Sequence, residues 1–124
     1  MLRKTLIFIP LVFFMIMGAL SLLAPGVISD VLGVSPDNPV GSGTVRGDFA
    51  ALFLTGGIAC ALALFRGRTH YLWVPISLIG ITFMGRLVEG IVSGFGRGVA
   101  QTMIIELIIV VMLAFAMRLD RSHV

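Results

Sequence analysis

Five ionisable side chains interrupt the apolar stretches of this chain, and their types suit binding chemistry. They are Arg46, Asp48, Arg86, Glu89 and Glu106. Arg86 and Glu89 are three residues apart within the apolar run 71–92, so on a helix they share a face. Charges in hydrocarbon are energetically costly and rarely face lipid. We therefore expect these side chains to gather, and the helices that carry them to be arranged accordingly.

Depth along the expected helices brings Arg86 and Glu106 to one level. Arg86 lies about 12 Å below the end of the third apolar stretch, and Glu106 lies about 10 Å below the start of the fourth, at a rise of about 1.5 Å per residue. We predict that Arg86 pairs with Glu106, because a guanidinium fork holds carboxylates well. Glu89 or Asp48 is expected as a further partner. The five charges sum to about −1 when ionised, which would suit a protonated carboxylate, a bound cation or a basic ligand group.

The composition is that of an integral membrane protein. Of 124 residues, 58% are hydrophobic and 12% are charged, and the mean hydropathy is +1.10. Soluble domains hold roughly 45–50% apolar residues, and so short a chain cannot bury the excess in a water-soluble core. We predict a single all-α membrane domain, a bundle of four transmembrane helices with up-down topology.

Four apolar stretches are long enough to cross a bilayer. The predicted spans are about 5–24, 46–65, 71–93 and 99–117, and residues 25–45 form an outer loop. Within that loop, the apolar residues of 27–32 have the spacing of a short interfacial helix. The first stretch follows a basic start and so resembles a signal peptide, but it is longer than a usual signal core, and we predict an uncleaved helix.

The basic residues favour one orientation. Most of them fall on a single side of the predicted spans: Arg3, Lys4, Arg66, Arg68, Arg118 and Arg121. The positive-inside rule then places both termini in the cytoplasm. With that orientation, the five charges in the spans lie in the outer half of the membrane.

Small side chains at helical spacing predict close helix packing. Ala51, Thr55, Ala59 and Ala63 recur every four residues in the second span. Gly90 and Gly94 form a second pair of this kind near the end of the third span. Small residues let helices approach closely in membranes, within one chain or between a chain and its partner.

The order of these motifs resembles a known family. Arg46 stands near the mouth of the second span, Gly85-Arg86-Leu87 is followed by the acid-glycine pair Glu89-Gly90, and Glu106 lies in the last span. The chain is similar, from about 46 to 117, to the small four-helix bacterial membrane proteins catalogued as domain of unknown function 4345. The resemblance implies a multi-pass protein of the bacterial inner (plasma) membrane and implies no activity.

Two functional hypotheses follow from the charges and the small residues. The first is a binding or transport-related site, in which Arg86 holds an anion and Glu89 or Glu106 holds a cation or proton. Its partners would be membrane lipid or a small polar ligand. The second is an accessory subunit of a membrane complex or a homo-oligomer, in which the charges serve helix pairing alone.

Other functions are not expected. The sequence offers no nucleophile-base pair and no metal-ligand spacing, and His70 and His123 fall on the side opposite the charges, so we predict no enzyme, no metal and no cofactor. No basic patch interleaves with aromatic residues, which argues against nucleic acid. Cys60 is expected to be a small packing residue, since one cysteine supports neither an intrachain disulfide nor a metal site.

Overall fold

The computed structural model describes residues 1–34 and 38–121, with backbone alone at 97–99, 120 and 121. The described chain is helical throughout, as predicted, and His123 lies outside it. The elements are α1 (Leu2–Leu23), α2 (Pro25–Leu32), α3 (Pro39–Thr44), the π-helical turn η1 (Val45–Phe49), α4 (Ala50–Arg66), the 3-10 turn η2 (Thr69–Leu72), α5 (Trp73–Ser93) and α6 (Arg97–Arg121). At about 1.5 Å per residue, the 22 residues of α1 extend about 33 Å, enough to cross a bilayer.

The second long helix begins earlier than predicted. Helical backbone runs without a break from Pro39 through η1 to Arg66, whereas the sequence placed its start at Arg46. The Asn38 side chain accepts a hydrogen bond from the Gly41 backbone N–H at 2.9 Å, and Pro39 occupies the first turn. Asparagine caps and first-turn prolines both favour helix initiation, which accounts for the difference.

The expected outer loop is therefore largely helical. The short helix expected there is present as α2, which starts at Pro25 and ends at Gly33, where φ is +70°. The part of the loop at 35–37 lies outside the described residues. The other helices also differ from the predicted spans by a few residues at their ends, and α6 continues to Arg121.

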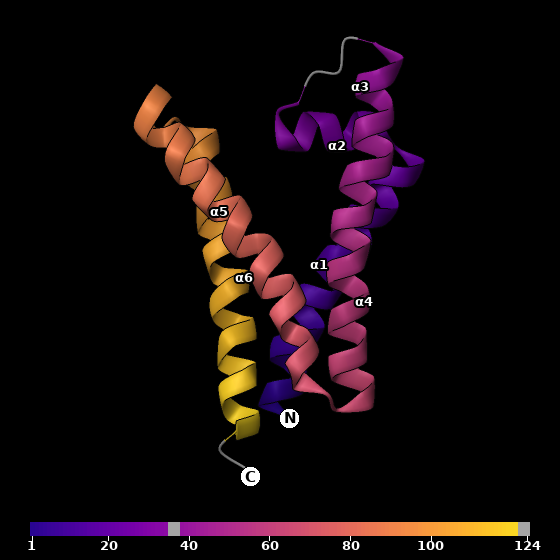
Figure 1. Cartoon of the computed structure of the whole chain (residues 1–124), viewed down its shortest axis with the longest axis vertical. Helices are drawn as coiled ribbons and strands as arrows, with labels where there is room; N and C mark the ends of the chain where they lie inside the picture. The colour runs from indigo at the N-terminus through magenta and orange to yellow at the C-terminus, as the bar shows by residue number, and fades with distance from the viewer. Residues whose placement is uncertain (35–37, 122–124) are drawn as a thin grey trace.

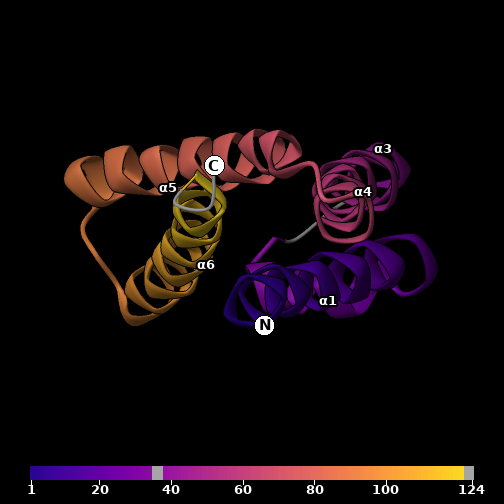
Figure 2. The ribbon, with the colours of Figure 1, turned by 90° about the horizontal axis from the view of Figure 1, so that it is seen from below.

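The long helices form two pairs that diverge at one end (Figure 1). One pair is α1 with α4 and the other is α5 with α6; α1 also contacts α6, and α4 contacts α5. Viewed from below, the two pairs lie next to each other (Figure 2). The start of α1 and the end of α6 lie at the end opposite the divergence (Figure 1).

The shared core joins the two pairs. It is built from Ile7, Leu11, Phe14, Phe53, Cys60, Ala63, Leu72, Ile79, Ile109, Leu113 and Ala116. Phe13, Phe14 and Phe53 form an aromatic cluster with ring centroids 5.7–6.5 Å apart. Cys60 is fully buried and free, which confirms its predicted role as a packing residue.

Glycines set the close approach of α1 and α4, and the predicted stripe of small residues does so only in part. Ala59 and Ala63 are buried, whereas Ala51 and Thr55 are exposed, so only the second half of the stripe packs within the described chain. Gly56 and Gly57 instead face Phe14 and its neighbour on α1. The contact face of α4 is thus rotated from the predicted stripe.

The second predicted pair, Gly90 and Gly94, does not join two helices. Gly90 is buried, and a Cβ there would collide with the ring of Phe95. Gly94 is exposed and has φ of +94°, so it ends α5. Its role is to turn the chain, because L side chains rarely adopt that conformation.

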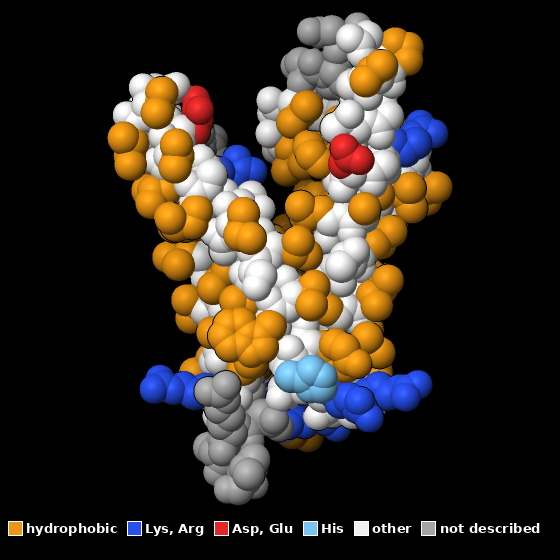
Figure 3. Space-filling model, viewed as in Figure 1, with side chains coloured by type: hydrophobic (Ala, Val, Ile, Leu, Met, Phe, Trp, Pro, Cys, Tyr) orange, Lys and Arg blue, Asp and Glu red, His pale blue; other side chains and the backbone are white. Residues whose placement is uncertain are grey.

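Four helical segments are long and apolar enough to cross a membrane. Their bounds are Leu2–Leu23, Pro39–Arg66, Thr69–Ser93 and Ala100–Leu119. Apolar side chains cover much of the outer surface of both helix pairs (Figure 3). A continuous apolar surface of this kind is not tolerated in water, so the chain is a multi-pass membrane protein.

The packing of α1 on α4 generates a first prediction. A Cβ on Gly18 would lie 2.6 Å from Leu54 Cγ and 3.3 Å from the Leu54 backbone nitrogen. Gly18→Ala should therefore lower the free energy of unfolding by about 1–3 kcal/mol, the usual effect of overpacking. Thermal unfolding in detergent measures the change.

Gly80→Ala is the matched control, since a Cβ on Gly80 meets nothing within 4 Å. Both changes raise helix propensity equally, so their difference isolates the steric effect. Equal unfolding temperatures for the two variants would contradict the close approach.

Candidate functional site

The predicted ion pair between α5 and α6 is present. Arg86 Nε donates a hydrogen bond to Glu106 Oε1 at 2.6 Å. The side chain of Glu106 is 9% exposed and that of Arg86 is 27% exposed. The carboxylate is thus nearly enclosed, while the guanidinium keeps an open side. A charge-assisted contact of this length is among the stronger hydrogen bonds in proteins.

The pair leaves polar groups without partners. Glu106 Oε2 is fully buried and has no hydrogen-bond partner among the described residues. Arg86 contacts Glu106 through Nε alone, so the fork is not closed on the carboxylate, and its two Nη groups show no partner in the described chain. Buried polar atoms are normally satisfied, because an unmade hydrogen bond costs about 1–3 kcal/mol. A buried acceptor and the two Nη groups of a partly exposed guanidinium therefore remain without a partner among the described residues at one place.

Arg86 and Glu106 line a cavity of about 410 Å³ between the two helix pairs. Its floor and walls are almost entirely apolar, and its polar lining is Arg86, Glu106, Thr82 and Thr102. The apolar lining comes from both pairs and from the connection between α1 and α3: Phe13, Met17, Val31, Leu32, Val34, Phe49, Leu52, Phe53, Ile79, Ile105 and Ile109. Figure 3 shows the molecule hollowed between the diverging helices. The volume falls in the usual range for ligand sites, about 300–1,000 Å³.

A π-helical turn contributes one wall of the cavity. Phe49 is the last residue of η1 and lines the cavity directly before α4 begins. Single π-turns inside α-helices are rare and frequently occur at functional sites. The position of Phe49 in the wall of this cavity fits that pattern.

The other three predicted charges do not join the pair. Arg46, Asp48 and Glu89 are exposed, and among the side chains that the structure describes none of the three makes an ion pair. The prediction of Glu89 or Asp48 as a further partner was wrong. Glu89 is one turn from Arg86 but is exposed, and it does not line the cavity; Arg46 and Asp48, which lie in η1, do not line it either.

Two polar residues of the site, Thr82 and Thr102, were not predicted from the sequence. Thr82 and Thr102 each stand four residues before a member of the pair, on the same helix face. That spacing was the available signal. Thr82 Oγ1 donates a hydrogen bond to the Leu78 carbonyl at 2.8 Å. The same hydroxyl oxygen can still accept a hydrogen bond from another group. The aromatic lining carries no comparable signal in the sequence.

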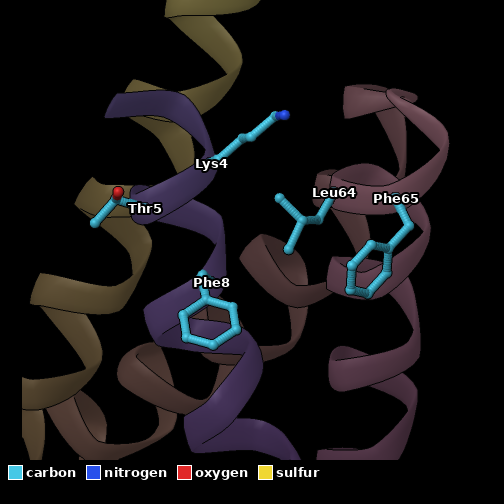
Figure 4. Close-up of a pocket in the computed structure, with 5 residues that line it drawn as sticks. All are labelled: Lys4, Thr5, Phe8, Leu64 and Phe65. Carbon is cyan, nitrogen blue, oxygen red and sulfur yellow. The ribbon is translucent and has the colours of Figure 1, made fainter. Parts of the chain in front are cut away.

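A second hollow, of about 340 Å³, lies near the chain termini. It is lined by Lys4, Thr5, Phe8, Leu64 and Phe65, from α1 and α4 (Figure 4). Lys4 is exposed, and the Thr5 hydroxyl donates to the Met1 carbonyl. None of the described residues that line this hollow has a buried polar atom without a partner. We therefore do not regard it as a ligand-binding site. Over the described residues, no three His, Cys, Asp or Glu side chains cluster as metal ligands would.

The ion pair generates a charge-swap prediction. Arg86→Glu and Glu106→Arg should each destabilise the fold by about 3–5 kcal/mol, because each leaves two like charges facing in a low-dielectric site. The double variant restores opposite charges and should recover most of the loss. The yield of monodisperse protein in detergent and its unfolding temperature report the outcome.

Glu89→Gln serves as the control, since it removes a carboxylate from the same helix at an exposed position. It should unfold at the wild-type temperature. Single variants of Arg86 and Glu106 that are as stable as the parent would show that the pair contributes nothing to folding.

The chain was compared with protein-family models, with curated proteins and with solved structures, and no match was found. The resemblance to the domain of unknown function 4345 therefore stays a prediction that rests on Arg46, the 85–90 motif and Glu106.

Proposed function

We propose that this protein is a non-enzymatic, binding or transport-related protein of the bacterial inner membrane. Its ligand is an amphipathic molecule that enters the cavity between the two helix pairs. The apolar part of the ligand lies among the aromatic and aliphatic side chains, and its polar end meets Arg86 and Glu106.

One observation carries the proposal: Arg86 and Glu106 line an apolar cavity, and the pair leaves one carboxylate oxygen of Glu106 buried without a hydrogen-bond partner in the described chain. Ion pairs that serve helix pairing alone are best satisfied by closing the fork on the carboxylate. Here the geometry leaves hydrogen-bonding capacity on the cavity side. Intramembrane ionisable residues that line a cavity are characteristic of substrate and ion sites.

The charge distribution supports an orientation with both termini in the cytoplasm. Basic side chains gather at the end of the molecule where the termini lie (Figure 3). Arg3, Lys4, Arg66, Arg68 and Arg118 are the described members of this group. Successive long helices run in opposite directions (Figure 1), as an up-down bundle of four spans requires. By the positive-inside rule, the cavity then belongs to the outer half of the membrane.

The alternative function is an accessory subunit or a homo-oligomer. The exposed half of the small-residue stripe, Ala51 and Thr55, favours this alternative because it leaves a smooth surface on α4. Native mass spectrometry separates the two functions. A stable oligomer that retains no lipid would favour the accessory role, and a monomer that carries lipid would favour the binding role.

Filling the cavity tests the proposal directly. Lipid extract added to delipidated protein should raise the unfolding temperature of the wild type, because a ligand at about 100 times its Kd stabilises a protein by about 2.7 kcal/mol. Thr82→Phe places a ring in the cavity and should abolish most of the shift.

Ile81→Phe is the matched control, because Ile81 is the neighbouring residue on α5 and is 72% exposed. It should keep the full shift. Equal shifts for both variants, or no shift in the wild type, would overturn the proposed binding site.

A further inference from the structure

We propose that the polar end of the ligand is a zwitterionic head group with a primary ammonium, as in phosphatidylethanolamine. Its phosphate oxygens accept from the Arg86 Nη groups, and its ammonium donates to Glu106 Oε2. The inference rests on the proposed function, since it assigns the chemistry of a ligand bound in the same cavity.

The charges of the pair favour a head group with both signs. Arg86 and Glu106 are joined at 2.6 Å and together are neutral. A purely anionic head group would satisfy the guanidinium but would leave Glu106 Oε2 without a donor and place a second negative charge beside the carboxylate. A purely cationic one would do the reverse at Arg86. A zwitterion places each of its charges against the opposite charge, and adds no net charge to a low-dielectric site.

The unpartnered oxygen calls for an N–H donor. An ionised carboxylate oxygen only accepts hydrogen bonds, and Glu106 is 93% buried, its residue exposure being 7%. Glu106 Oε2 itself has no partner among the described groups. A primary ammonium has three donors and is smaller than its methylated forms. A trimethylammonium, as in phosphatidylcholine, has the same charge but no N–H to donate.

The cavity favours a lipid over a soluble zwitterion. Its lining beyond the polar end is apolar, from Phe13 and Met17 on one side to Ile105 and Ile109 on the other. A head group without chains would leave that surface unfilled. Burial of acyl methylenes against it adds about 0.8 kcal/mol each, so the chains contribute affinity that soluble phosphoethanolamine lacks.

The test is a methylation series measured by native mass spectrometry on the full-length protein. Delipidated protein is offered phosphatidylethanolamine, its monomethyl and dimethyl forms, and phosphatidylcholine, all with the same acyl chains. Retention should fall along the series, by about tenfold or more between the ends, the usual effect of losing a hydrogen bond to a charged group. Phosphatidylglycerol, which has the anion without the ammonium, should also be retained less than phosphatidylethanolamine.

Two variants and one soluble compound complete the experiment. Glu106→Gln replaces the accepting oxygen with an amide N–H₂ and should remove the preference, whereas Glu89→Gln should keep it. The series on the wild type decides the question even where Glu106→Gln fails to fold. Stabilisation by soluble phosphoethanolamine at concentrations where the lipid gives none would overturn the assignment of a lipid.

The outcomes separate this inference from the proposed function. Equal retention of all four lipids by the wild type, with displacement by Thr82→Phe, would overturn the head-group assignment and leave the binding site standing. Failure to retain any lipid would overturn both. A preference that survives in Glu106→Gln would place the ammonium elsewhere and refute the assignment to Glu106.

Discussion

The ion pair between Arg86 and Glu106 is the constraint on which the rest of the structure depends. Either side chain alone in hydrocarbon would strongly oppose membrane insertion. Their contact at 2.6 Å ties α5 to α6 at one level, roughly 10 Å or more below the end of the helix pair. The contact fixes the rotation of both helices. Thr82 and Thr102, one turn away on the same faces, are thereby turned into the same cavity.

The ion pair lines the cavity that lies between the two diverging helix pairs. The apolar core from Ile7 to Ala116 packs the two pairs against each other. Toward the other end, α2 and η1 lie against the α1–α4 pair, and α5 and α6 lean away (Figure 1). The polar pair sits where the core gives way to the cavity. An apolar space with one polar wall is a shape that selects amphipathic molecules over both ions and hydrocarbons.

The helices and the central pair could be predicted from the sequence, because both follow from distances along the chain. Apolar length fixes the spans, and a rise of about 1.5 Å per residue fixes depth. Rotation about the helix axis is different, since it depends on packing. Glu89, three residues after Arg86, lies about 60° around the helix from it, and packing turned it outward. For the same reason the spacing of Ala51 and Thr55 did not reveal that Gly56 and Gly57 lie on the face that meets α1. The helix start at Pro39 was not predicted, because the polar, glycine-rich composition there is typical of a loop. The capping side chain of Asn38 nevertheless allows the helix to begin at Pro39.

The tight link between α5 and α6 bears on the biogenesis of the protein. Residues 94–96 connect the two helices, and the Phe95 ring lies over Gly90, which fixes where α6 begins relative to α5. A hairpin with that register brings its arginine and its glutamate opposite each other as it leaves the translocon. An isolated arginine at mid-membrane opposes insertion by about 2.5–3.5 kcal/mol on translocon scales. Entry of the two helices as a unit would let the two charges cross together, so we expect the third and fourth spans to insert as one hairpin.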